Sequence, residues 1–135
     1  MAIDILETVL YTDDLPAAES FYAEVLGLEV QASSPGRHVF FRCERQMLLI
    51  FAPAETAKPS AAAGLPIPTH EARGPGHVCF RATAHEIDRW RVKLLKKGVT
   101  IDADFNWPTG GRSIYFRDPA GNSLEFAEPR IWNLD

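Results

Sequence analysis

The sequence has few cysteines. Only two occur in 135 residues, Cys43 and Cys79, and both stand inside strand-like runs. Two cysteines do not make a disulfide framework, and buried free thiols are the favoured interpretation over a bridge between them. This usage excludes a small disulfide-stapled scaffold and predicts a reducing compartment, the cytoplasm.

Long apolar segments and basic clusters are also missing. No apolar run is long enough to span a membrane, and the N-terminus carries acidic residues where a secretory signal would need basic ones. The formal net charge is −4, and Lys and Arg do not cluster beyond the surroundings of Lys96 and Lys97. We therefore expect neither a nucleic acid nor a membrane as partner.

An internal repeat occupies much of the chain. Residues 36–51, GRHVFFRCERQMLLIF, align without a gap over residues 111–126, GRSIYFRDPAGNSLEF, at an offset of 75. The stretches upstream of both segments share the pattern of strand, helix, glycine stop and strand. Hydrophobic residues make up 46% of the chain and charged residues 24%, which is typical of a globular protein. The pattern predicts an α+β fold built from two tandem βαβββ modules.

The helix boundaries carry recognisable signals in both modules. Asp13 and Asp14 are cap candidates for the first helix, with Pro16 in its first turn and Gly27 as its stop. Thr83 and Glu86 have capping-box spacing before the second helix. Residues 1–135 are expected to form a single domain with these parts: module one at 3–52, a linker loop at 53–74, module two at 75–128 and a tail at 129–135. The linker is rich in Pro, Ala and Gly, which predicts a surface connection with little regular structure.

Three segments carry a resemblance to a known family. They are ETVLYTDDLPAAESFYAEVLGL, GPGHVCFRA and the closing hairpin SIYFRDPAGNSLEF. Together they resemble the vicinal oxygen chelate superfamily, the group of glyoxalases, bleomycin-resistance proteins and extradiol dioxygenases, over nearly the whole chain. The resemblance implies that the two modules form a curved mixed sheet around a small-molecule cleft.

The resemblance also implies a set of metal ligands. Members that bind metal use up to four positions, two in each module. One is the first residue of the opening strand, and the other lies on the last strand. Transferred to this sequence, these positions are Glu7, Ile50, His77 and Glu125. The repeat supports the mapping, because Glu7 and His77 head equivalent strands and Ile50 falls on Glu125 at the offset of 75. The predicted ligands are therefore Glu7, His77 and Glu125, although relatives often have His where this chain has Glu7.

One imidazole and two carboxylates can hold a divalent ion such as Mn, Fe(II), Ni, Co or Zn and leave positions open for substrate. Strand alternation turns Glu125 away from its apolar neighbours, Leu124 and Phe126. The resemblance then implies a glyoxalase-like lyase or isomerase, in which Glu7 or Glu125 moves a proton and the metal stabilises an enediolate-type oxyanion. The alternative is a metal-free, bleomycin-resistance-like binding protein for a small molecule or drug.

Further side chains are expected to line the cleft: Tyr11, Ile50, Cys79, Arg81, Trp107 and Ile114. Arg81 could bind a substrate carboxylate or phosphate, or pair with an acid at the strand end. Trp107 could cap a ligand or anchor its own loop. Ile114 would face Glu125 if the hairpin turn has four residues.

The resemblance implies a homodimer, because small two-module members usually pair. The tail at Ile131-Trp132-Asn133-Leu134 is apolar enough to dock on a partner, or to pack on its own chain.

Overall fold

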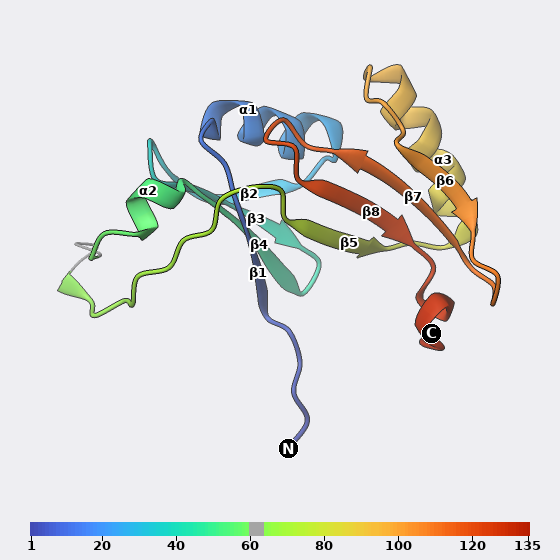
Figure 1. Cartoon of the computed structure of the whole chain (residues 1–135), viewed down its shortest axis with the longest axis horizontal. Helices are drawn as coiled ribbons and strands as arrows, with labels where there is room; N and C mark the ends of the chain where they lie inside the picture. The colour runs from blue at the N-terminus through green and yellow to red at the C-terminus, as the bar shows by residue number, and fades with distance from the viewer. Residues whose placement is uncertain (60–63) are drawn as a thin grey trace. The chain divides into compact units, whose positions relative to one another are not determined.

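The chain folds as two compact units, Met1–Gly74 and Pro75–Asp135, in a computed structural model that describes residues 1–59 and 64–135 (Figure 1). Unit 1 contains β1 (Glu7–Tyr11), α1 (Leu15–Ser20), η1 (Phe21–Val25), β2 (Glu29–Ser34), β3 (His38–Cys43), β4 (Gln46–Phe51) and α2 (Pro53–Thr56). Unit 2 contains β5 (His77–Arg81), α3 (Ala84–Lys96), β6 (Ala103–Asn106), β7 (Arg112–Arg117), β8 (Ser123–Ala127) and η3 (Pro129–Trp132). The order strand, helix and three strands recurs in both units, so the predicted α+β class and βαβββ repeat are confirmed.

Each unit forms its own four-stranded mixed sheet. The strand orders are β1-β4-β3-β2 in unit 1 and β5-β8-β7-β6 in unit 2. In both sheets the opening strand lies parallel to the last strand, and the other neighbours are antiparallel. The opening strand of each module therefore lies next to the closing strand, which brings residues far apart in sequence into register.

The helix ends follow the signals in the sequence. The Asp14 side chain accepts a hydrogen bond from the backbone N–H three residues on, at 3.1 Å. Helix α1 continues as one π-helical turn, η1, and Gly27 with φ of 74° follows it. At α3 the capping box is complete, because Thr83 and Glu86 each bond the backbone N–H of the other. These caps satisfy N–H groups that the first helical turns leave without partners.

The helix of each unit covers one face of its sheet, called here the helix face. In unit 1 the rings of Tyr22 and Phe41 lie 5.3 Å apart, and in unit 2 those of Trp90 and Phe126 stack at 4.6 Å. Strand alternation then assigns the other inward side chains. The helix face is made by Val39, Phe41, Leu48 and Ile50 in unit 1, and by Ile114, Phe116, Leu124 and Phe126 in unit 2, all of them buried.

The hairpins of the two units differ by one residue. Phe41 pairs with Leu48 in unit 1, and Phe116 pairs with Leu124 in unit 2. In unit 2 the turn is closed by Asp118 and Asn122, whose backbone and side chains bond each other and leave three residues outside that pair. In unit 1 the corresponding pair is Cys43 and Gln46, which leaves only two residues, 44 and 45, in the turn. The repeat offset is therefore 75 up to the hairpin and 76 after it.

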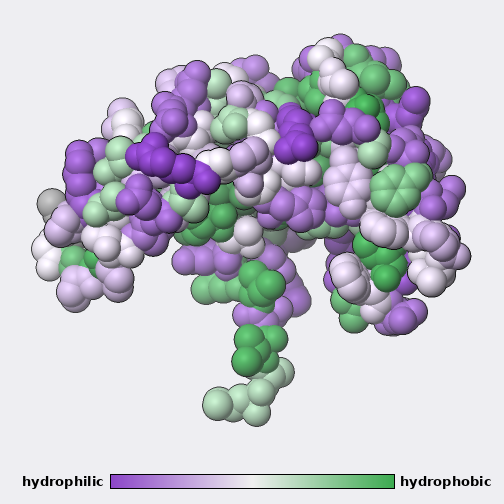
Figure 2. Space-filling view, in the orientation of Figure 1, coloured by the Kyte–Doolittle hydropathy of each residue, from purple (hydrophilic) through white to green (hydrophobic). Residues whose placement is uncertain are grey.

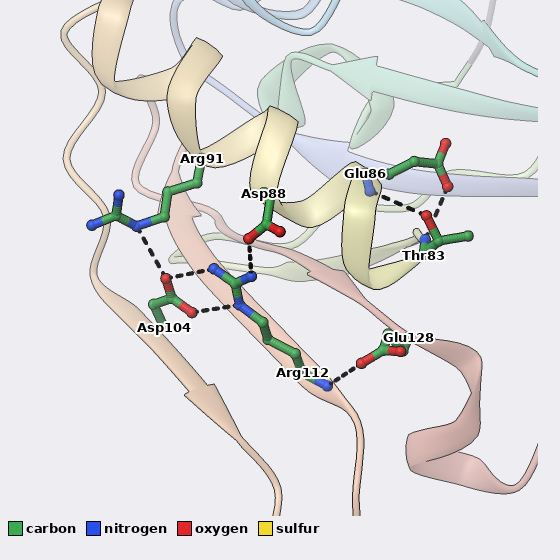
Figure 3. Close-up of polar contacts among 7 residues, drawn as sticks. All are labelled: Thr83, Glu86, Asp88, Arg91, Asp104, Arg112 and Glu128. Carbon is green, nitrogen blue, oxygen red and sulfur yellow. Dashed lines mark hydrogen bonds and ion pairs between the residues drawn. The ribbon is translucent and has the colours of Figure 1, made fainter.

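A network of charged side chains ties α3 to β6 and β7 in unit 2 (Figure 3). The Arg112 guanidinium donates to both carboxylate oxygens of Asp104 at 2.9 Å and also contacts Asp88 on α3. Arg91, one turn along α3, donates to the same Asp104 carboxylate at 3.1 Å. Glu128 accepts from the Arg112 backbone N–H at 2.8 Å, which links the segment after β8 to the same network.

The segment before β1 carries exposed apolar side chains. Ile3 is 98% exposed and Leu6 is 70% exposed. Figure 2 shows a mostly apolar extension where Figure 1 places the N-terminus. In the described parts of the chain, no helix combines the length and apolar character needed to cross a membrane.

Candidate functional site

An imidazole and a carboxylate meet on the opposite face of sheet 2, the side away from α3. His77 opens β5, and Glu125 lies in the middle of β8, where it pairs with Cys79 in the parallel ladder. The His77 Nε2 atom lies 3.3 Å from Glu125 Oε1. The His77 side chain is 50% exposed, whereas that of Glu125 is 6% exposed, so the pair has one buried and one accessible partner.

The hydrogen bond of the other imidazole nitrogen fixes how this pair can work. The His77 Nδ1 atom lies 2.8 Å from the backbone carbonyl oxygen of Ser123. Because a carbonyl oxygen only accepts, Nδ1 must carry the proton. In a neutral ring the Nε2 lone pair then faces the Glu125 carboxylate, an arrangement that a proton or a cation between the two atoms makes favourable. Metal-binding histidines commonly have this orientation.

Glu125 itself has unused capacity for hydrogen bonds. Its Oε2 atom is buried and, among the described residues, has no hydrogen-bond partner. A buried carboxylate oxygen without a partner costs about 1–3 kcal/mol or more, because the group has lost its water. The donor set and this oxygen therefore fit a divalent cation, which would bond the carboxylate and the imidazole together.

The neighbours of Glu125 are a phenol and a thiol. Desolvation, followed by hydrogen bonding to Glu125 and its charge, raises the pKa of Tyr115 to about 12. Desolvation, followed by the charge and hydrogen bond of the same carboxylate, raises the pKa of Cys79 to about 12. Both groups are therefore protonated at neutral pH, so Tyr115 is a hydrogen-bond donor to the site and Cys79 is a poor nucleophile.

Tyr115 was not predicted, and the length of the turn explains why. With the closed turn of Asp118 to Asn122, Tyr115 pairs with Glu125 and Ile114 pairs with Phe126. Ile114 is 0% exposed on the helix face, so its predicted place in the cleft is wrong. The four-residue turn on which that prediction depended would have shifted the strand by one residue and reversed its faces.

The same shift corrects the fourth metal position. Val9 pairs with Leu49 in β4, just as Cys79 pairs with Glu125 in β8, so Leu49 is the equivalent of Glu125. Ile50 is fully buried on the helix face, and its prediction as a cleft residue is wrong. The position is apolar in either register, so unit 1 offers no second carboxylate there.

Glu7 opens β1 and pairs with Met47, as His77 opens β5 and pairs with Ser123. It lies on the opposite face of sheet 1 and is exposed. In the described part of the chain, no three His, Cys, Asp or Glu side chains come together as a metal-binding group. That Glu7 joins His77 and Glu125 at one ion stays a prediction.

Aromatic rings extend from the pair across sheet 2. The ring of Tyr115 lies 6.2 Å from that of His77 and 5.9 Å from that of Phe105, stacked with both. Phe105 packs edge-on against Trp107 at 4.8 Å, and the Trp107 indole N–H donates to the Ser113 hydroxyl at 2.8 Å. Trp107 is thus anchored in its own unit, and it forms the end of an aromatic wall beside the imidazole and the carboxylate.

Two other side chains predicted to line the cleft, Arg81 and Tyr11, make hydrogen bonds within their own units. Arg81 donates to the backbone oxygen of Asp135, the last residue of the tail. The Tyr11 hydroxyl lies 2.5 Å from Nδ1 of His70. Desolvation, followed by the charge of Glu71, raises the pKa of Tyr11.

Comparison with known proteins identifies the family. The model of the Glyoxalase/Bleomycin resistance protein/Dioxygenase superfamily matches residues 4–126. A lactoylglutathione lyase from Agrobacterium tumefaciens is 45% identical over 100% of both chains, with a TM-score of 0.93. A virulence protein from Salmonella typhimurium is 28% identical over 95% of this chain and 98% of that chain, with a TM-score of 0.68.

A glyoxalase/bleomycin resistance protein/dioxygenase from Nocardioides shares the fold at 22% identity, over 95% of this chain and 84% of that chain, with a TM-score of 0.72. No curated protein matches the sequence. The match of the family model to nearly the whole chain confirms the predicted resemblance, and the chain belongs to the Glyoxalase/Bleomycin resistance protein/Dioxygenase superfamily.

Proposed function

We propose that this protein is a metal-dependent lyase or isomerase of the glyoxalase type, which acts on a small molecule with two adjacent oxygens. The observation that carries the proposal is the contact between His77 Nε2 and Glu125 Oε1 at 3.3 Å, made while Nδ1 is bound to a carbonyl. The buried Glu125 Oε2, without a partner among the described residues, supports the same conclusion. Two bases that face each other in this way favour a cation.

The proposed ligands are His77 and Glu125, with Glu7 as the third. Mn, Fe(II), Ni, Co and Zn all suit one imidazole and two carboxylates. When bound, such an ion would polarise the two adjacent oxygens of the substrate. Glu7 and Glu125 are the carboxylates available to take and return a proton at the neighbouring carbon. Tyr115, whose pKa of about 12 keeps it protonated, pairs with Glu125 across β7 and β8 and is available to donate to its carboxylate.

Lactoylglutathione is the first substrate to test, because the Agrobacterium relative at 45% identity is a lactoylglutathione lyase. The protein is stripped with a chelator, reloaded with each of the five metals, and assayed for interconversion of the lactoylglutathione thioester and its isomer, the hemithioacetal of glutathione and methylglyoxal. The reaction is started from the hemithioacetal, because the thioester is the more stable isomer. Glu125→Gln should lower kcat by roughly 10²–10⁴-fold, the usual contribution of a proton-transferring group. His85→Ala, an exposed histidine on α3, is the control and should leave kcat unchanged.

The outcomes separate substrate from mechanism. Activity that survives metal removal and Glu125→Gln would contradict the proposed mechanism. Metal binding without turnover of lactoylglutathione would overturn the substrate and keep the metal site.

A metal-free binding protein is the second candidate. The apolar Leu49, at the position equivalent to Glu125, and the wall of Phe105, Trp107 and Tyr115 favour it, because such a cleft needs shape and aromatic surface. This candidate predicts that the purified protein retains none of the five metals and still binds an aromatic drug.

We also propose a homodimer in a reducing, cytoplasmic compartment. Trp132 is 75% exposed and Leu134 is 57% exposed, while Ile131 packs against Gly111 of its own chain. Ile131 thus anchors the tail to its own unit, and the exposed Trp132 and Leu134 support the proposal that the tail docks on a partner. Both cysteines are free thiols, which supports the compartment. Light scattering should return twice the 15.0 kDa of one chain, and a value of one chain would contradict the dimer.

A further inference from the structure

A cavity lies within unit 1 and is lined by residues of that unit alone. It has a volume of about 250 Å³ and is formed where the segment after β4 folds back over the ends of β3 and β4. It is lined by Arg37, His38, Phe40, Phe51, Thr56, Lys58, Ile67, Pro68 and His70. The backbone N–H of His70 bonds the carbonyl of Thr56 at 3.0 Å, which holds the returning segment against α2. Five residues of the predicted linker loop therefore line the cavity: Thr56, Lys58, Ile67, Pro68 and His70.

Four of the nine residues that line this cavity carry aromatic rings. His38 stacks on Phe40 with ring centroids 4.0 Å apart and planes only 8° from parallel. Phe51 meets Phe40 edge-on at 5.3 Å and His70 edge-on at 5.1 Å. The walls thus offer both ring faces and ring edges, the two surfaces on which another aromatic ring packs favourably.

Polar groups of the cavity favour a negative charge. Nδ1 of His38 is buried and has no hydrogen-bond partner among residues 1–59 and 64–135. Desolvation, followed by the charge of Arg37, lowers the pKa of His38, so its ring is neutral at pH 7 and can present an N–H there. Arg37 and Lys58 bring two positive charges to the lining. Glu55 offsets one of them through its 2.7 Å contact with Lys58.

We propose that this cavity is a binding site for a small aromatic carboxylate, with the ring among His38, Phe40 and Phe51 and the carboxylate at Arg37. An arginine beside an apolar cavity recognises a carboxylate by charge-assisted hydrogen bonds. The volume of about 250 Å³ lies just below the usual range for drug-sized ligands, roughly 300–1,000 Å³, which suits a ligand of one ring. The site uses residues of unit 1 alone and does not depend on the metal proposed for His77 and Glu125.

Isothermal titration calorimetry on the full chain tests the proposal by measuring the affinity of three compounds of matched size, two carboxylates and one alcohol. Benzoate has an aromatic ring and a negative charge, benzyl alcohol has the aromatic ring without the charge, and cyclohexanecarboxylate has the charge on a saturated ring. Benzoate should bind roughly tenfold more tightly than benzyl alcohol, since a hydrogen bond to a charged group contributes that much. It should also bind more tightly than cyclohexanecarboxylate, which lacks an aromatic ring to pack on the rings of the cavity. Equal binding of all three compounds, or of none, would overturn the proposal.

Variants locate the binding. Arg37→Met should weaken benzoate by roughly tenfold and leave benzyl alcohol unchanged. Arg42→Met is the matched control, because Arg42 is an exposed arginine at the far end of β3 that bonds Glu44 and does not line the cavity. Phe40→Leu keeps an apolar side chain and should weaken the binding of both aromatic probes, benzoate and benzyl alcohol. The unfolding temperature of each variant shows that it is folded.

The result is independent of the proposed function. In His77→Ala, which removes the metal ligand, benzoate affinity should be unchanged. Loss of benzoate binding in His77→Ala with no effect of Arg37→Met would place the ligand elsewhere and refute the site. Metal retention without benzoate binding would refute only this inference, and benzoate binding without metal retention would refute only the proposed function.

Discussion

Glutamate placed at Ile50 or at Leu49 separates two registers of the internal repeat. An alignment at a constant offset of 75 puts Ile50 in the place of Glu125, so that Ile50→Glu would add a fourth carboxylate to the site. In the structure Ile50 is 0% exposed and pairs with Val39 on the helix face, beneath α1 and η1. Leu49 is on the opposite face, two residues from the half-buried Met47. Only Leu49→Glu should therefore be compatible with the fold.

The size of the effect follows from three contributions. Removing the Ile50 side chain from the core loses about 1.5–3 kcal/mol of apolar burial. A buried carboxyl must take up a proton at pH 7, about 2.7 pH units above its usual pKa of about 4.3, which costs about 4 kcal/mol. The neutral carboxyl then lacks partners, at about 1–3 kcal/mol. Together these amount to roughly 6.5–10 kcal/mol, which is comparable to the whole stability of a domain, about 5–15 kcal/mol.

Leu49 is 8% exposed, and Leu49→Glu should lose about 2–4 kcal/mol, most of it the burial of the leucine, because the longer glutamate side chain can carry its carboxylate out to solvent. Urea unfolding followed by circular dichroism measures both variants, with Ile50→Val as a control that should cost about 0.5–1.5 kcal/mol. A folded Ile50→Glu protein within about 2 kcal/mol of wild type, together with an unfolded Leu49→Glu protein, would refute the register.

Three further predictions concern unit 2. Gly111→Ala should destabilise the protein by about 2–4 kcal/mol, because a Cβ there would lie 2.5 Å from Ile131 Cγ2 at a φ of 95°; Gly121→Ala, with a φ of 88° and open space, should cost only the backbone strain of about 1–2 kcal/mol in the same urea assay. Hydrogen bonds from the Arg112 guanidinium lower the pKa of Asp104 below its usual 3.8, so its contribution of about 1 kcal/mol should be present above pH 5 and vanish as the pH falls below 3. The difference in free energy of unfolding between wild type and Asp104→Asn should be smaller at pH 3 than at pH 7, and an equal difference at both would contradict this reasoning. In a variant without the other cysteine, alkylation of Cys79 should keep rising with pH up to about 12, and a plateau near pH 8–9 would show an ordinary thiol.

The repeat, the helix boundaries and the position of Glu125 could be read from the sequence because each depends on local patterns. Capping residues act within a few positions, as Thr83 and Glu86 do, and strand alternation sets the face of a residue between two apolar neighbours. The equivalence across the hairpins could not be read, because one additional residue in the turn reverses every side chain of the next strand. Because of that single residue, Leu49 and Tyr115 lie on the opposite face, where the sequence had predicted Ile50 and Ile114.

The unit 1 cavity had no signal in the sequence. His38 and His70 show no ligand spacing. His38 meets Phe51 because the two residues pair across β3 and β4, and His70 meets it because its segment packs back against unit 1. Such a contact depends on tertiary packing and not on any local period. The near match of Phe40 to Tyr115 in the repeat was the one available hint, since it placed an aromatic residue at the same position of both sheets.

Metal retention by His77→Ala, compared with wild type and His85→Ala, tests the central claim most directly. Each protein is stripped, dialysed against Mn, Fe(II), Ni, Co or Zn in turn at micromolar concentration, and its bound metal is measured by mass spectrometry. We predict that wild type and His85→Ala each retain at least one of these metals at one ion per chain, and that His77→Ala retains none while keeping its circular dichroism spectrum. Retention of none by the wild type, or equal retention by His77→Ala, would contradict the account.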